Sequence, residues 1–309
     1  MVCSLPFFTD GETLVSYSDD GTAALWYPET GSLSPKQLLG SSFRPYVALA
    51  LSGKVLVSIS VDEEIKLWRI TKSTIEPIPT FQGLSSADEP RETREVIFSP
   101  CDRILASLSE ETIQLCDART ATDSLRLKHT LVGHSGHIWG TLSFSPNSQL
   151  LATSSRDKTL KLWNTATGSL EKTFQFHPMN VLELEFSPNA QFIACYSIGE
   201  HRRDLPLLDI AAGDQKQIWR SVGYTRRLTF SRDGSYLNTD LDTWTSSLSP
   251  ISPRDDVEIS ILESHWVTFN RRKKLWLPPE YRPSCFAIYR NVLVLGYGSG
   301  RVLFINFCP

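Results

Sequence analysis

The sequence lacks most of the patterns that mark common functional classes. None of its six cysteines is spaced as a CxxC pair, so we expect no redox motif or cysteine zinc site. It has no Gly-x-x-x-x-Gly-Lys-Ser/Thr loop to hold a nucleotide, and its apolar runs fall well short of the roughly 20 residues of a membrane span. The net charge of −3 gives no strong field toward nucleic acid or an anionic membrane.

These absences favour an intracellular protein without a cofactor. Several cysteines lie in apolar, strand-like runs, which is typical of reduced, buried thiols. The first residues show no basic region followed by an apolar run, so we expect no secretory signal. We therefore predict a cytoplasmic protein that binds no metal, nucleic acid or membrane.

A short phrase returns along the chain at intervals of 42 to 46 residues. Its copies are Phe98-Ser99-Pro100, Phe144-Ser145-Pro146, Phe186-Ser187-Pro188 and Phe230-Ser231-Arg232. Each copy is followed by polar turn residues and then by a short apolar run. A fixed period in the forties, made of short runs with turns between them, indicates repeated units of β-strands.

A second phrase joins an acidic turn residue to a tryptophan six positions later. It occurs as Asp20 and Trp26, as Asp62 and Trp68, and as Asp157 and Trp163. The third unit keeps the gap but has Glu110 and Cys116 instead. The residues between them alternate as in a half-buried strand.

Residues 131–174 contain the complete unit, which closely resembles a WD40 repeat. Gly133-His134 matches the Gly-His pair of that family, and Trp163-Asn164 stands where Trp-Asp is usual. The resemblance implies strands at about 137–144, 150–155, 159–164 and 169–176, counted outward. It also implies a structural hydrogen-bonded tetrad, formed by His134, a hydroxyl of Ser154 or Ser155, Asp157 and Trp163.

The same residue types could suggest a Ser-His-Asp enzyme. We interpret them as structural, because they fit a position that locks the blade and no oxyanion site accompanies them. An enzyme on a propeller scaffold is the alternative, and it would need carboxylates or histidines that converge on a central channel. The basic run Arg271–Lys274 is interpreted as a solvated loop.

The repeats predict an all-β, single-domain WD40 β-propeller of seven blades, with eight as the alternative. The predicted units cover about 1–40, 45–82, 94–131, 137–176, 181–221, 224–262 and 265–307. The count depends on a proline-rich region at about 250–283, which either forms an extra blade or completes the last one.

The C-terminal residues resemble one particular group of WD40 proteins. Residues 275–284 and 295–302 resemble the C-terminal WD40 region of fungal NACHT-type NTPases, which include vegetative-incompatibility proteins. The resemblance implies a sensor or scaffold, since the nucleotide-binding loop is missing. The alternative is a degenerate or truncated WD40 fragment without independent function.

Partner binding is expected on the rim where the loops before the first strand and between the second and third strands gather. On the fourth unit this rim comprises His137, Trp139 and Arg156, and the second unit offers Arg44 and Tyr46. Exposed aromatic and arginine side chains are typical binding anchors. We predict a monomeric, non-enzymatic scaffold for other proteins.

Overall fold

The structure is a computed structural model of the whole chain. It describes residues 2–5, 14–18, 22–27, 32–33, 37–38, 47–50, 55–59, 65–71, 74–78, 95–108, 112–118, 125–138, 142–176, 180–199, 203–220, 228–231, 233–234, 236–239, 243–245, 259–262, 266–269, 272–289 and 292–307.

The described residues form antiparallel sheets and one short 3-10 helix, η1 (Pro279–Tyr281). They fall into two compact units, of which the first contains Met1–Arg91, Ala118–Leu125 and Arg254–Pro309, and the second contains Glu92–Asp117 and Arg126–Pro253. The all-β prediction is confirmed. A single domain over residues 1–309 stays a prediction.

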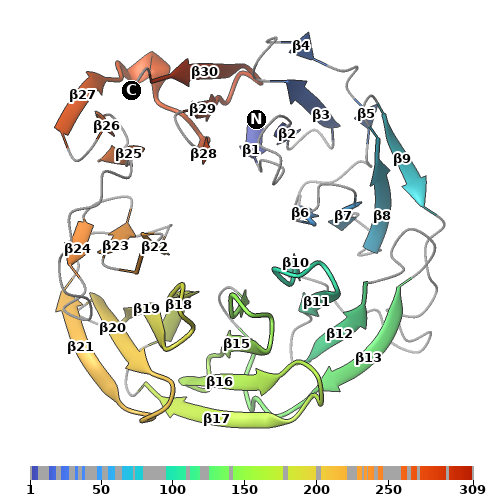
Figure 1. Cartoon of the computed structure of the whole chain (residues 1–309), viewed down its shortest axis with the longest axis vertical. Coiled ribbons are helices and arrows are strands. Elements are labelled where there is room, and N and C mark those ends of the chain that lie inside the picture. Colours follow the sequence, from blue (N-terminus) through green and yellow to red (C-terminus); the bar gives the residue numbers. More distant parts are fainter. Residues whose placement is uncertain are drawn as a thin grey trace. The chain divides into compact units, whose positions relative to one another are not determined.

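The first unit holds four sheets (Figure 1). They are β1 (Val2–Ser4), β2 (Leu14–Ser18), β3 (Thr22–Tyr27), β4 (Ser32–Leu33) and β5 (Gln37–Leu38); β6 (Val47–Leu49), β7 (Val55–Ile59), β8 (Ile65–Ile70) and β9 (Ile75–Ile78); β25 (Ile259–Leu262), β26 (Trp266–Phe269) and β27 (Arg272–Trp276); and β28 (Cys285–Tyr289), β29 (Val292–Gly296) and β30 (Val302–Asn306).

The second unit also holds four sheets. They are β10 (Glu95–Phe98), β11 (Ile104–Leu108), β12 (Ile113–Asp117) and β13 (Arg126–Leu131); β14 (Ser143–Phe144), β15 (Leu150–Ser154), β16 (Thr159–Asn164) and β17 (Leu170–Gln175); β18 (Asn180–Phe186), β19 (Phe192–Ile198), β20 (Arg203–Asp209) and β21 (Gln215–Arg220); and β22 (Leu228–Phe230), β23 (Tyr236–Thr239) and β24 (Thr243–Thr245).

The expected seven or eight complete blades are not found. In the described part of the chain only five sheets have four or more strands, and the other three have three strands each. One predicted boundary is also wrong, because β25 pairs with β26. We expected the sixth unit to end at 262 and the seventh to begin at 265. This boundary instead falls inside a single hairpin, formed by β25 and β26. The apolar run at β25 is too short to show a periodicity that would assign it to the sixth or the seventh unit.

The recurring Phe-Ser-Pro phrase is a turn between two strands. In four sheets the serine hydroxyl accepts the backbone N–H of the residue five positions later, over 2.9–3.0 Å. The third residue after each serine has a positive φ, between 57° and 75°. These residues are Asp102, Ser148, Ala190 and Gly234. The repeated phrase therefore encodes a left-handed turn fixed by a side-chain hydrogen bond.

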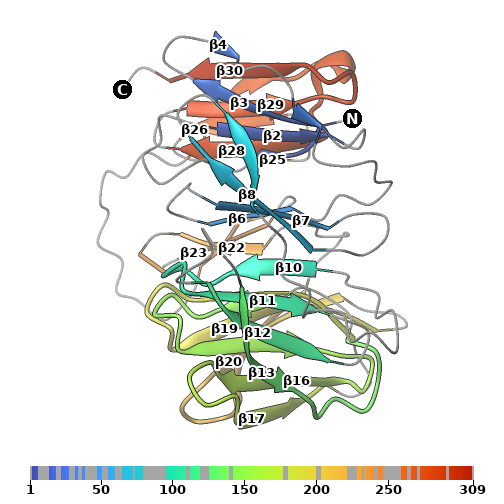
Figure 2. The same cartoon turned by 90° about the vertical axis from the view of Figure 1, so that its right-hand side faces the viewer.

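Neighbouring sheets within each unit bury apolar faces against one another. In the second unit, Leu160 of β16 and Val181 of β18 lie in one core cluster that joins two sheets. In the first unit, Trp26 of β3 and Phe304 of β30 have ring centroids 6.0 Å apart, so the β1–β5 sheet packs beside the β28–β30 sheet (Figure 2). A strand pair too small to bury its own faces is stabilised by these contacts.

Candidate functional site

The fourth repeat positions the candidate site on three strands of one sheet. β15, β16 and β17 lie within one residue of the expected ranges at every end. The expected strand at 137–144 is shorter, since only β14 and an isolated bridge between Ile138 and Ser155 are formed among its described residues.

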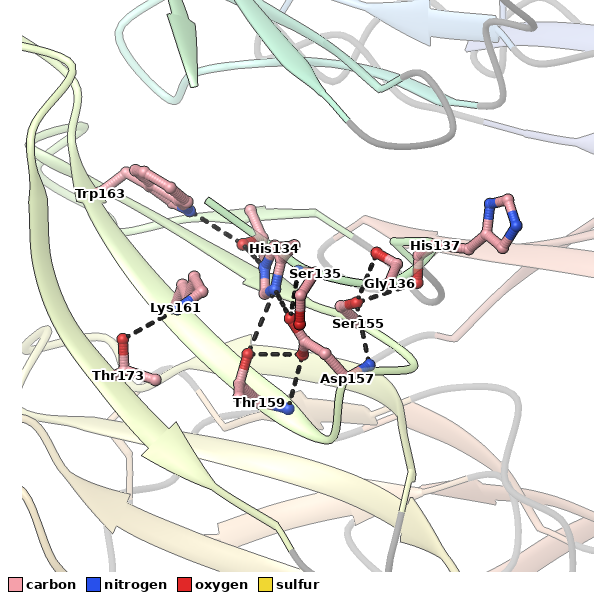
Figure 3. A network of polar contacts seen from close by, with 11 residues as sticks. His134, Ser135, Gly136, His137, Ser155, Asp157, Thr159, Lys161, Trp163 and Thr173 are labelled. Carbon is pink, nitrogen blue, oxygen red and sulfur yellow. Dashed lines mark hydrogen bonds and ion pairs between the residues drawn. The ribbon is translucent and has the colours of Figure 1, made fainter. Parts of the chain in front are cut away.

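A buried chain of hydrogen bonds links the first loop of this repeat to the third strand (Figure 3). His134 Nδ1 lies 2.9 Å from Asp157 Oδ2, and His134 Nε2 lies 2.9 Å from Thr153 Oγ1. Trp163 Nε1 donates to the same Thr153 hydroxyl over 2.9 Å. Because a carboxylate only accepts, Nδ1 carries the proton, and Nε2 accepts from the threonine.

The hydroxyl in this chain was predicted wrongly. It belongs to Thr153, whereas Ser154 Oγ donates to the carbonyl of Val181 over 3.2 Å. Ser155 Oγ donates instead to the carbonyls of Gly136 and His137. Alternation along β15 points Ser154 to the opposite face from Thr153, so the neighbouring serine cannot replace it.

A spacing in the sequence could have identified Thr153. Trp26 Nε1 donates to Ser16 Oγ over 2.6 Å, and Trp68 Nε1 donates to Ser58 Oγ over 2.8 Å. In each case, as in the fourth repeat, the hydroxyl precedes the tryptophan by ten residues. Where Cys116 replaces the tryptophan, the residue ten positions earlier is Ala106, which has no hydroxyl.

Asp157 is the charged member of the network. Its burial would raise the pKa of the carboxyl, but hydrogen bonds from the Thr159 hydroxyl, the Ser135 N–H and His134 outweigh this and lower it to about 2. Thr159 also donates its backbone N–H over 2.9 Å. Desolvation lowers the pKa of His134, although Asp157 opposes that shift. The pair is therefore a neutral imidazole bonded to a carboxylate.

Burial gives this network a structural role. The side chains of His134 and Thr153 have no exposed surface, and Trp163 is 3% exposed. A nucleophile and its base must reach a substrate, which these groups do not. A Cβ built on Gly133 would lie 3.1 Å from the Trp163 ring, so the Gly-His pair also leaves room for the indole.

The network also fixes the backbone of the rim. Ser155 Oγ holds the carbonyls of Gly136 (2.8 Å) and His137 (3.0 Å), and the Arg156 N–H donates to the His137 carbonyl (2.9 Å). The Arg156 side chain is exposed and that of His137 is half-buried, and the His137 ring points away from the network (Figure 3). The other predicted rim residues, Trp139, Arg44 and Tyr46, lie outside the described residues.

A second group of titratable residues lies on two strands of the second unit. Glu95 of β10 accepts the N–H of Leu142 over 3.2 Å. Burial raises the pKa of Glu95 to about 7, and Glu183 of β18 adds to the shift. Burial and the same Glu183 raise the pKa of Glu185 to about 7. Over the described residues, no three His, Cys, Asp or Glu side chains are grouped to hold a metal ion.

No helix in the described part is both long enough and apolar enough to span a membrane.

The segment that contains most of the candidate site matches a known protein family. Residues 125–164 match the family described as "WD domain, G-beta repeat". The matched segment runs from β13 to β16, so the chain contains a WD repeat within an all-β fold of antiparallel sheets.

Similar proteins carry the same kind of repeat. The eukaryotic translation initiation factor 3 subunit I of Neosartorya fischeri is 40% identical over 91 residues, which are 28% of this chain and 26% of that protein. The nuclear distribution protein PAC1 of Arthroderma otae is 28% identical over 223 residues, 62% of this chain and 46% of that protein. The chain thus spans about a quarter to a half of these relatives. Neither is a NACHT-type protein, so the fungal NACHT resemblance is not supported.

Proposed function

We propose that this chain is a protein-interaction module, and that the rim of its fourth repeat binds a partner. The rim is defined as the loop 134–138 together with the turn 155–158. The observation that carries the proposal is the backbone locking of these two segments by Ser155, while Arg156 is exposed beside them. A pre-organised loop loses little conformational entropy on binding, and arginine is a frequent anchor of interfaces.

The chemistry of the site supports binding over catalysis. The histidine–carboxylate–hydroxyl chain described in the fourth repeat is buried. Its polar groups are hydrogen-bonded to one another. The proposal therefore assigns no reaction to the chain. A subunit of an initiation factor is named among the relatives, which is compatible with a role in a protein complex.

Two finer predictions stay open to direct tests. A cytoplasmic location is part of the proposal, and microscopy of the tagged full chain checks it. Derivation from a fungal NACHT-type sensor stays a prediction from residues 275–302. Recovery of the chain joined to a nucleotide-binding domain in the source genome would support it.

The experiment compares two charge reversals in a pull-down from the source cells. Arg156→Glu alters the rim, and Arg126→Glu makes the same change on the exposed face of β13. We expect the partners of the unaltered chain to be lost with Arg156→Glu and retained with Arg126→Glu. His137→Ala, in the loop of the rim, provides a second rim variant. Partners that survive both rim changes would show that another surface binds them.

A further inference from the structure

Among the described residues, the β25–β27 sheet has three strands, whereas the complete sheets have a fourth. The strand order is β25-β26-β27, and among the described strands β27 pairs only with β26. Every residue from Arg272 to Tyr289 is described. After β27 the chain passes through η1, whose Pro278 and Pro279 interrupt strand pairing, and enters β28 of the next sheet. The connection itself therefore forms no fourth strand.

The complete sheets show what is missing. Their third strands, β8, β12, β16 and β20, are each covered by an antiparallel fourth strand. A strand presents backbone N–H and C=O groups to both sides, and among the described strands none pairs with the outer side of β27. Such an edge is a template for pairing with another chain.

The side chains at this edge are exposed, in contrast to those of the complete sheets. On the third strand of the fourth repeat, Trp163 is 3% exposed, whereas Trp276 of β27 is 46% exposed. Leu275 is 41% exposed, although its neighbour across the pair, Val267, is fully buried. An exposed tryptophan and leucine beside an open edge provide apolar anchors for an added strand.

The charge of this region has the opposite sign to that of the whole chain. Residues 259–309, counted from the start of β25, contain seven lysines and arginines, four of them consecutive at 271–274, and two acidic residues, Glu263 and Glu280. The formal charge of the segment is therefore 7 − 2 = +5, while the whole chain carries −3. A positive edge favours an acidic partner and disfavours a basic one.

We propose that the open edge of β27 accepts an extended, acidic segment of a partner protein as the fourth strand of its sheet. Backbone hydrogen bonds give the affinity, and alternate side chains of the added strand meet the cations and Trp276. This inference rests on the proposed protein-binding function, but it uses a different surface from the rim.

The first test uses the full chain and a synthetic peptide of about eight alternating Glu and Val residues, a length typical of strands. Binding is followed by fluorescence anisotropy of the labelled peptide. A peptide with the same charges but alternate N-methylated amides cannot form the ladder, so we expect its binding to be lost. Equal binding of both peptides would overturn the proposal, since charge alone would then explain it. Absence of binding by the unmethylated peptide would overturn it as well.

The second test locates the binding site. Lys273→Glu with Lys274→Glu should weaken peptide binding about tenfold at low salt. Arg103→Glu with Arg126→Glu changes the net charge equally in the other unit and should leave it unaltered. Trp276→Ala should also weaken it. Equal loss in both double variants would overturn the proposal, as would dimerisation of the chain through β27, detected by light scattering.

The rim variant separates this inference from the proposed function. Arg156→Glu should not affect peptide binding if the site is β27. If the peptide does not bind but Arg156→Glu still abolishes partner capture, the proposed strand site on β27 is wrong and the proposed rim function stands. If both rim variants retain their partners and the peptide still binds, the proposed rim function is wrong and the strand site on β27 stands.

Discussion

Trp163 donates its indole N–H to Thr153, ten residues earlier on the neighbouring strand, over 2.9 Å. The Thr153 hydroxyl in turn donates a hydrogen bond to His134 Nε2, so one hydroxyl connects the third strand to the first loop. The same tryptophan–hydroxyl pair occurs at Trp26 and Trp68. It is a repeated device that ties the second and third strands of a sheet together.

Thr153→Val tests the hydroxyl. The change keeps the shape of the side chain but leaves the Trp163 N–H and His134 Nε2 without their partner in a buried site. We expect the free energy of unfolding to fall by about 2–4 kcal/mol, because two buried polar groups lose a hydrogen bond. Urea denaturation measures it.

Two other variants serve as controls for Thr153→Val. Thr130→Val, on the exposed side of β13, should change stability by less than about 0.5 kcal/mol. Ser154→Ala removes the hydrogen bond to the Val181 carbonyl, and the loss of that bond should cost about 1 kcal/mol. A cost for Thr153→Val no larger than that for Ser154→Ala would contradict the assignment.

Asp157 makes stability depend on pH in the acid range. Its pKa is lowered in the folded state from 3.8 to about 2. Its contribution is therefore fully present above pH 3.8 and is lost as the pH falls through about 2. Asp157→Asn should be less stable than the unaltered chain at pH 7, and the difference should shrink on acidification.

The measurement for Asp157 is the midpoint of denaturation at a series of pH values. Asp214→Asn is a matched control, because Asp214 is exposed and its carboxylate pairs with the exposed Lys216. A gap between the unaltered chain and Asp157→Asn that stays constant from pH 7 to pH 2 would argue against the carboxylate as the stabilising form.

Much of the β structure was predictable from local patterns. The Phe-Ser-Pro phrase and the alternating run before Trp163 locate the turn and the last three strands of the fourth repeat to within a residue, because both depend only on near neighbours. The choice between Thr153 and Ser154 required knowing which face of β15 points at the indole. Pairing of β25 with β26, in the proline-free stretch between Pro253 and Pro278, was missed, since strand pairing is decided by the partner as well as by the segment. The rim residue Arg156 is exposed as expected, but its binding role is untested.

Glu95 and Glu185 should produce the opposite pH response. The pKa of each is about 7 when folded, above the ordinary 4.5. The folded state therefore binds protons more tightly, and stability should fall as the pH rises from about 4.5 to about 7. Glu95→Gln with Glu185→Gln should remove this fall and raise stability at pH 8.

Thermal unfolding across pH 4–8 tests this double variant. Glu280→Gln, on the exposed η1, should leave the pH profile unchanged. If the double variant follows the same profile as the unaltered chain, the two carboxyls are not the groups responsible.

Ala190 offers a stabilising substitution. It has a φ of 57° in the turn after Ser187, where the matching turn after Ser231 has Gly234. A left-handed conformation costs an L-residue about 1–2 kcal/mol, so Ala190→Gly should stabilise the chain by up to about 1 kcal/mol after the added chain entropy is counted. The melting temperature measures it.

Ala212→Gly is the comparison for Ala190→Gly. Ala212 is exposed in a turn and is not among the positive-φ residues. Glycine there only increases the freedom of the unfolded chain, so the melting temperature should fall. The same sign of change for both substitutions would contradict the strain assigned to Ala190.

The buried thiols of the second unit give the chain its own reporters of local opening. Cys116 and Cys195 have no exposed surface, and burial raises the pKa of Cys116 to about 12 and that of Cys195 further. Cys101 is exposed. An alkylating reagent at neutral pH therefore modifies Cys101 first, because thiolate is the reactive form. Cys116 and Cys195 react later, and mass spectrometry resolves the two sites. The rate at Cys116 measures how fast β12 opens, and the rate at Cys195 measures independently how fast β19 opens.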